Sequence, residues 1–79
     1  MTIEEAVADI AINNLQNLAP NTEFYLRDIM EKENWNSLNF HSQGKVGKLF
    51  FSKLKSQNLL NSSVIYLGNS DGVERYKKI

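Results

Sequence analysis

The residues with the clearest chemical potential lie along one side of a helix predicted for residues 40–57. Five polar or basic residues recur there at intervals of four, three, four and three: His41, Lys45, Lys48, Ser52 and Lys55. At about 100° per residue, this spacing places them on one face roughly 80° wide, and that face contains no acidic residue. Ammonium groups repeated along a helix are typical phosphate donors. We call these five residues the basic stripe, and the spacing predicts that it binds nucleic acid.

A second set of candidates lies near the end of the chain. Arg75, Lys77 and Lys78 fall in a segment predicted to be a β-strand, where they would form a second phosphate contact beside the stripe. Tyr66 and Tyr76 are interleaved with these cations and are candidates for stacking on an unpaired base. Two structural alternatives stay open. A lysine-rich face can simply solvate an amphipathic helix, and strand aromatics usually pack across strands or into a core.

The sequence lacks the patterns of catalytic and metal sites. His41 is the single histidine and the chain has no cysteine, so a zinc site would lack its other ligands. The segment Gly44-Lys45-Val46 resembles the end of a phosphate-binding loop, but Asn39 and Val46 stand where that motif needs Gly and Ser or Thr. We expect a protein that is not an enzyme and that uses no cofactor, metal or small-molecule substrate.

Charge is distributed unevenly along a chain whose formal net charge is zero. Residues 1–33 hold seven acidic and two basic residues, whereas residues 34–79 hold seven basic and two acidic ones. The acids Glu4, Glu5 and Asp9 suit the start of a helix, because the helix dipole favours negative charge there. The alternative is that this acidic helix face docks a basic protein partner.

Length and composition indicate one small domain covering residues 1–79. The absence of cysteine is typical of a reducing compartment, so we expect a cytoplasmic protein. No apolar run approaches the roughly 20 residues that span a bilayer, and the first residues do not resemble a signal peptide, so we expect no membrane partner.

The N-terminal segment is predicted to form a helix over residues 3–18. Thr2 and Glu5 form a capping-box pattern at its start, and Pro20 ends it. Its predicted buried face consists of Ile3, Ala6, Val7, Ile10, Ala11, Leu15 and Leu18.

The remaining elements are shorter, apart from the helix that carries the stripe. We expect a strand over residues 22–26, a helix over 27–32 and a connection over 34–39. The helix over 40–57 should bury Phe40, Val46, Phe50 and Leu54. Strands over 63–67 and 73–77 should form a hairpin with a loop at 68–72. This order predicts an α+β winged helix-turn-helix fold, with three helices, a short strand and a C-terminal hairpin wing.

Most of the chain after about residue 13 resembles a family of small bacterial proteins known as domain of unknown function 1413. The resemblance is carried by FYLRDI at residues 24–29, Trp35 with Leu38, GKLF at 47–50 and RYKK at 75–78. It implies a winged-helix-like fold on phages and other mobile elements, where one member is linked to single-stranded DNA binding beside replication proteins. Lys48 stands where the family helix often has a basic residue. Residues 68–74 depart from the family's more polar wing.

The leading hypothesis is a nucleic-acid-binding module that contacts the DNA backbone, single- or double-stranded, through the stripe and the hairpin cations. The stripe lacks the Arg, Asn and Gln side chains usually aimed at base edges, so sequence-specific reading is not expected. The alternative is a protein-interaction module that uses the same fold without touching DNA.

Overall fold

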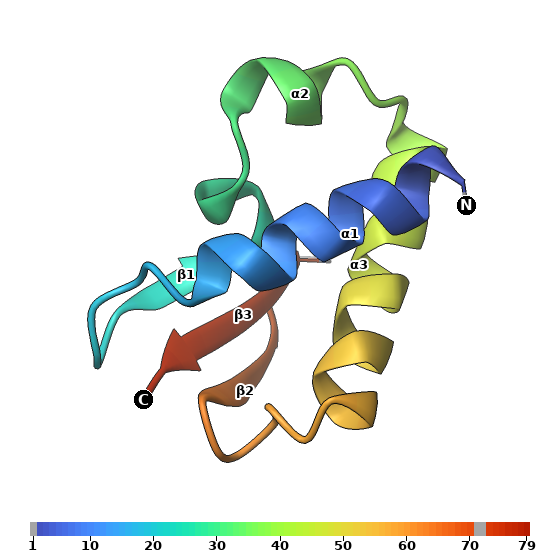
Figure 1. Ribbon diagram of the computed structural model, residues 1–79. Coiled ribbons are helices and arrows are strands. Elements are labelled where there is room, and N and C mark those ends of the chain that lie inside the picture. Colours follow the sequence, from blue (N-terminus) through green and yellow to red (C-terminus); the bar gives the residue numbers. More distant parts are fainter. Residues whose placement is uncertain (1, 71–72) are drawn as a thin grey trace.

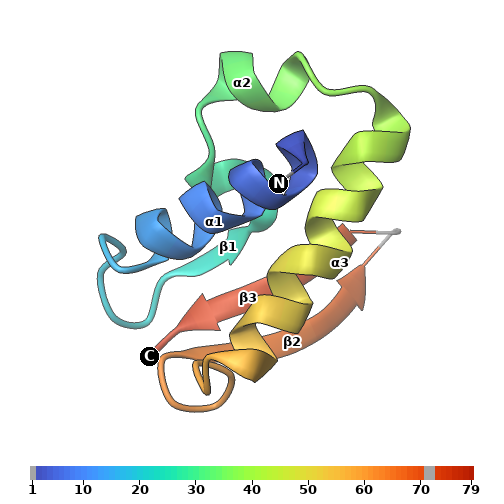
Figure 2. The same ribbon diagram turned by 45° about the vertical axis from the view of Figure 1, so that its right-hand side comes forward.

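The computed structural model describes residues 2–70 and 73–79. These residues form a mixed α+β fold with three α-helices, one 3₁₀ turn and three strands. The elements are α1 (Ile3–Leu15), β1 (Glu23–Tyr25), η1 (Leu26–Ile29), α2 (Lys32–Asn36), α3 (Phe40–Ser56), β2 (Val64–Ser70) and β3 (Val73–Lys78). The strands form an antiparallel sheet in the order β1-β3-β2, and α1 and α3 pack together with it around one core (Figures 1 and 2). No helix in the described residues has the length and apolar character needed to cross a bilayer.

The capping box predicted at the start of α1 is confirmed. The Thr2 hydroxyl accepts a hydrogen bond from the Glu5 amide at 3.2 Å, and the Glu5 carboxylate accepts one from the Thr2 amide at 3.4 Å. The helix ends at Leu15 rather than residue 18, because residues 16–18 form i→i−3 turns. Just before that end, the Asn14 side chain donates to the Ile29 carbonyl at 2.7 Å and ties α1 to η1.

The buried face of α1 differs from the predicted one. Val7, Ala11 and Leu15 are buried as expected, but Ala8 and Ile12 are buried too. Ile3 and Ile10 are 62% and 46% exposed. The buried face is therefore turned by roughly 80° from the predicted one. Small side chains at positions 8 and 11 allow α1 to approach its neighbours closely, which apolar spacing alone does not reveal.

The segment after β1 forms two short helical pieces instead of the one helix predicted for residues 27–32. The Asp28 carboxylate accepts a hydrogen bond from the Tyr25 amide at 2.9 Å and so caps η1. Met30 is extended, which ends η1, and α2 begins at Lys32. Ile29 and Met30 are both buried where the chain changes direction. The predicted connection over 34–39 is helical in its first part and a turn in its second.

Helix α3 matches its prediction closely, with one exception. Its first residue follows Asn39, whose side chain accepts a hydrogen bond from the Ser42 amide at 2.8 Å. Val46, Phe50 and Leu54 are fully buried, as the periodicity predicted. The prediction that Phe40 is buried is wrong, because its side chain is 92% exposed. Phe40 is the first residue of α3, and this first turn of the helix extends past the core.

The C-terminal hairpin is confirmed, with longer pairing than predicted. Residues 68–70 were expected in the loop, but they pair with residues 73–75. The register shifts between Tyr66 and Gly68, and Gly68 has a φ of 107°, which a residue with a side chain rarely adopts. The rest of the predicted loop, Asp71 and Gly72, lies outside the described residues.

Tyr76 lies at the centre of the core. Its ring centroid is 5.7 Å from that of Phe24, 5.3 Å from Phe50 and 5.5 Å from Tyr66. The side chain is 1% exposed, and its hydroxyl donates to the Glu74 carboxylate at 3.0 Å. Burial, together with the negative charge of Glu74, raises the pKa of Tyr76 well above its usual value.

The raised pKa predicts how stability depends on pH. The folded chain holds the Tyr76 proton more tightly than the unfolded chain, so this group stabilises the fold below about pH 10 and stops doing so as the pH rises further. We expect the free energy of unfolding to fall above pH 10 by up to about 1.4 kcal/mol per pH unit from this group. Urea unfolding of wild type and Tyr76→Phe between pH 7 and 11 measures it. Identical pH profiles for the two proteins would contradict the assignment.

Two glycines inside α3 lead to a second prediction. A Cβ atom added at Gly44 or Gly47 would meet nothing within 4 Å outside the local helix backbone. We expect Gly44→Ala and Gly47→Ala each to raise the free energy of unfolding by about 0.5–1 kcal/mol, since alanine favours a helix interior. Gly68→Ala is the matched control and should destabilise, because of its positive φ. Urea denaturation compares the three variants, and destabilisation by either helix substitution would contradict the prediction.

Candidate functional site

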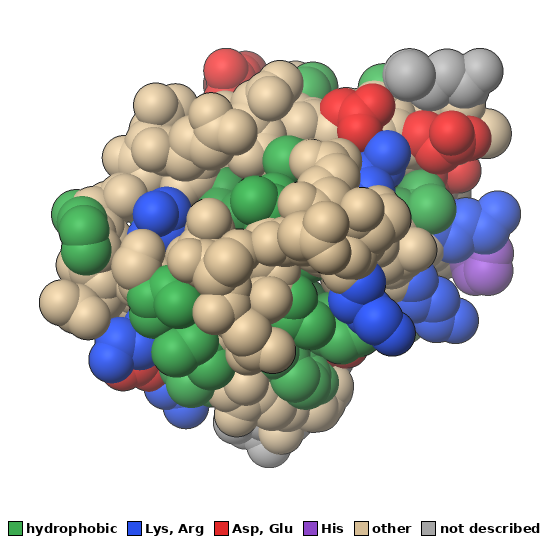
Figure 3. Space-filling model, turned by 60° about the horizontal axis from the view of Figure 1, so that its bottom comes forward, with side chains coloured by type: hydrophobic (Ala, Val, Ile, Leu, Met, Phe, Trp, Pro, Cys, Tyr) green, Lys and Arg blue, Asp and Glu red, His purple; other side chains and the backbone are tan. Residues whose placement is uncertain are grey.

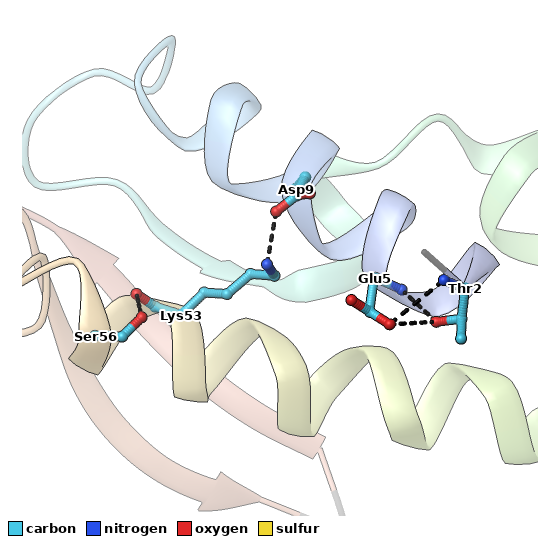
Figure 4. Close-up of polar contacts among 5 residues, drawn as sticks. All are labelled: Thr2, Glu5, Asp9, Lys53 and Ser56. Carbon is cyan, nitrogen blue, oxygen red and sulfur yellow. Dashed lines mark hydrogen bonds and ion pairs between the residues drawn. The ribbon is translucent and has the colours of Figure 1, made fainter.

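The basic stripe forms a continuous exposed face on α3. All five of its residues are exposed, and the core residues of α3 lie on the opposite side of the helix. Within the described part of the chain, the stripe lysines form no ion pair. Lys53, which lies outside the stripe, instead pairs with Asp9 of α1 at 2.8 Å (Figure 4). The stripe lysines are therefore exposed cations that are not held in ion pairs within the described residues.

One edge of the stripe borders acidic residues. Glu4 and Glu5 of α1 line a shallow surface depression together with Lys45 and Lys48. The Ser42 hydroxyl, on α3, donates to the Glu4 carboxylate at 3.4 Å. Figure 3 shows Lys and Arg side chains gathered around the histidine at one edge of the molecule, with acidic side chains close by. An anion approaching the stripe is consequently repelled on the α1 side, where Glu4 and Glu5 lie.

Of the hairpin cations, Arg75 and Lys77 do not join the stripe. Because Tyr76 points into the core and strand side chains alternate, Arg75 and Lys77 lie on the sheet face away from α3. Arg75 forms an ion pair with Glu23 of β1. Lys78 donates from Nζ to the Ile79 carbonyl at 3.3 Å. The structure thus separates Arg75 and Lys77 from the stripe, contrary to the prediction of a contact beside it, because strand alternation directs them to the other face of the sheet.

The two candidate stacking tyrosines lie in different environments. Tyr76 is in the core, with its ring packed among three other aromatic rings, so it presents no face to a base. Tyr66 is 37% exposed, and its ring meets that of Phe51 edge-on at 5.3 Å. Lys55 of the stripe places its Nζ 5.7 Å from the centre of the Phe51 ring. Of the two tyrosines, only Tyr66 reaches the surface.

A groove that the sequence reasoning missed lies between the N-terminal half of α3 and the hairpin. Its volume is about 320 Å³. Among the residues that line it are Arg27, Phe40, Gly44, Gly47, Lys48 and Glu74. Lys48 belongs to both the groove and the stripe, so the two surfaces are continuous.

Two signals in the sequence could have revealed this groove. Each glycine inside a helix costs about 1 kcal/mol relative to alanine, so a pair in one helix suggests a surface that must stay open. The spacing of Phe40 also differs from that of the buried residues of α3, which recur every four residues. Glu74 lines the groove because of the register of the hairpin strands, and the sequence did not specify that register.

Within the described residues, no group of three or more histidine, cysteine, aspartate or glutamate side chains is placed to hold a metal ion. The arrangement of the site can attract phosphate at the stripe and accommodate a small, mostly apolar group in the groove.

Comparison with known proteins identifies the family. No curated protein and no solved structure matches the chain. The sequence profile of one family, described as domain of unknown function (DUF1413), matches residues 9–78, which include η1, α3 and the hairpin. That match takes in the stripe, the residues that line the groove and the central tyrosine. The chain therefore belongs to the DUF1413 family.

Proposed function

We propose that this protein is a non-enzymatic winged-helix module that binds the backbone of DNA through the basic stripe. The observation that carries the proposal is the row of exposed cations on α3, with no ion-pair partner among the described residues. Lys45, Lys48 and Lys55 would each neutralise one phosphate. Arg75 and Lys77 of the hairpin are not part of this contact, since they lie on the sheet face away from α3.

The element order supports a winged-helix arrangement. A helix, a strand, two helices and a hairpin follow one another, and β1 pairs beside the hairpin strand β3. The turn between α2 and α3 is held by the Gln43 side chain, which donates to the Trp35 carbonyl at 3.0 Å and the Leu38 carbonyl at 3.3 Å. In helix-turn-helix proteins the second helix meets the DNA, and here that helix carries the stripe.

Charge reversal within the stripe tests the proposal. We expect wild type to bind short DNA at low salt, with a slope of log affinity against log salt of about −2 to −3, the value for three phosphate contacts. Lys45→Glu and Lys48→Glu should each weaken binding and bring the slope about one unit closer to zero. Fluorescence anisotropy of labelled single- and double-stranded oligonucleotides at several salt concentrations measures both quantities.

Lys32→Glu is the matched control, because it makes the same charge change at an exposed position on α2. It should leave the slope unchanged, and circular dichroism should show that all variants fold. Equal losses from Lys32→Glu and Lys48→Glu would mean that only net charge matters. No binding by wild type at low salt would refute the proposal.

One observation favours a second candidate function, the docking of a basic protein. Ile3 and Ile10 are exposed and lie seven residues apart on one side of α1, a helix that also carries Glu4 and Glu5 in its first turn. An exposed apolar strip on an acidic helix suits a basic amphipathic partner. If this candidate is correct, Ile10→Asp abolishes a nuclease-resistant complex isolated from host lysate, while Lys48→Glu preserves it.

A further inference from the structure

Phe40 occupies an unusual position for a large aromatic residue. It is the first residue of α3 and is 92% exposed, although an aromatic side chain usually buries most of its surface in a core or an interface. It lies at the groove, next in sequence to His41 of the stripe. The exposed ring is therefore adjacent to the surface proposed to bind DNA.

The groove beside Phe40 is open because two of the α3 residues that line it are glycines, which have no side chain. Gly44 and Gly47 leave that side of α3 bare, and no nearby atom requires glycine at either position. Leu26 of η1 and Val73 of β3 contribute apolar side chains to the other walls of the groove. The volume of about 320 Å³ is at the lower end of the range for small-ligand sites, which suits one flat ring system rather than a peptide helix.

The charges of the groove restrict what it can hold. The Glu74 carboxylate lines it and already accepts a hydrogen bond from the Tyr76 hydroxyl. This negative charge disfavours a phosphate inside the groove but can accept a further hydrogen bond from an N–H group. Lys48, in contrast, lines the groove and belongs to the stripe, where a phosphate is favoured. A nucleotide fits this division, with its phosphate on the stripe and its base in the groove.

We infer that the groove accepts one nucleobase of the DNA held by the stripe, stacked on Phe40, with Glu74 accepting a hydrogen bond from an N–H of the base. This inference rests on the proposed function. Stacking needs only an exposed base face. An unpaired base in a single strand presents one, as does a base step in a duplex that an apolar side chain has opened.

The experiment compares an oligonucleotide with a fully abasic one of the same length and charge, by anisotropy. Wild type should bind the base-bearing strand about tenfold more tightly than the abasic strand, within the range for stacking of a base on an aromatic side chain. Phe40→Ala should reduce this preference to within twofold and leave the salt slope unchanged, since no phosphate contact is lost. Phe40→Trp should retain the preference.

Two further variants separate base binding from damage to the fold. Gly47→Leu fills the groove with a good helix former and should lose the same preference while melting no lower than wild type. Ile10→Ala removes another exposed apolar side chain, on α1, and should behave as wild type. The same measurements on a duplex of matching sequence show whether the bound base comes from a single strand or from an opened base step. A Phe40 effect confined to the single strand assigns the site to an unpaired base, and an effect in the duplex assigns it to an opened step.

Failure of this inference can be distinguished from failure of the proposed function. If wild type binds both strands equally and with the full salt slope, the stripe is supported and the base site is refuted. Equal losses on both strands in Phe40→Ala would also refute it. If wild type binds no DNA at all, both proposals are refuted.

Discussion

The packing of Tyr76 at the centre of the sheet is the interaction on which the other features depend. Its ring contacts aromatic rings from β1, α3 and β2, so one side chain on the central strand joins three other elements. Its contact with Phe50 fixes which side of α3 faces the sheet. Because Val46, Phe50 and Leu54 are then buried, the stripe on the opposite side of α3 must face solvent. The exposure of the cations is thus a consequence of the core.

The same packing places the acidic N-terminal part of the chain beside the basic helix α3, so the uneven distribution of charge along the sequence becomes two adjacent surfaces of opposite charge. α1 carries acids near its start and packs against α3, with Lys53 and Asp9 paired between them. Such exposed pairs contribute only about 0–1 kcal/mol, so the pair affects the electrostatic field more than the stability. The ion pair neutralises Lys53, whereas the stripe lysines form no ion pair within the described residues. The exposed cations are therefore concentrated along the stripe, with Glu4 and Glu5 on the α1 side and Glu74 in the groove on the hairpin side.

Features set by local sequence were predictable, and those set by packing between elements were not. The capping box at Thr2 and Glu5, the period of Val46, Phe50 and Leu54, and the hairpin all arise from neighbouring residues. The rotation of α1 instead reflects how closely two alanines let it pack. The separation of the stripe from Arg75 and Lys77 follows from the face that Tyr76 occupies, and no charge pattern reveals that face. The stripe itself was predictable because it is local to one helix, whereas the groove requires β3 to be placed beside α3.

Helix α3 consequently presents three faces with different physical demands. One face is apolar and buried, and it contributes Val46, Phe50 and Leu54 to the core. The second face bears the exposed lysines. The third carries Gly44, Gly47 and Phe40. The glycines weaken the helix and the aromatic ring is exposed to water, and no packing contact within the described chain compensates for either cost. A small domain without disulfides has little stability to spare, and this is the physical reason to seek a ligand for the third face.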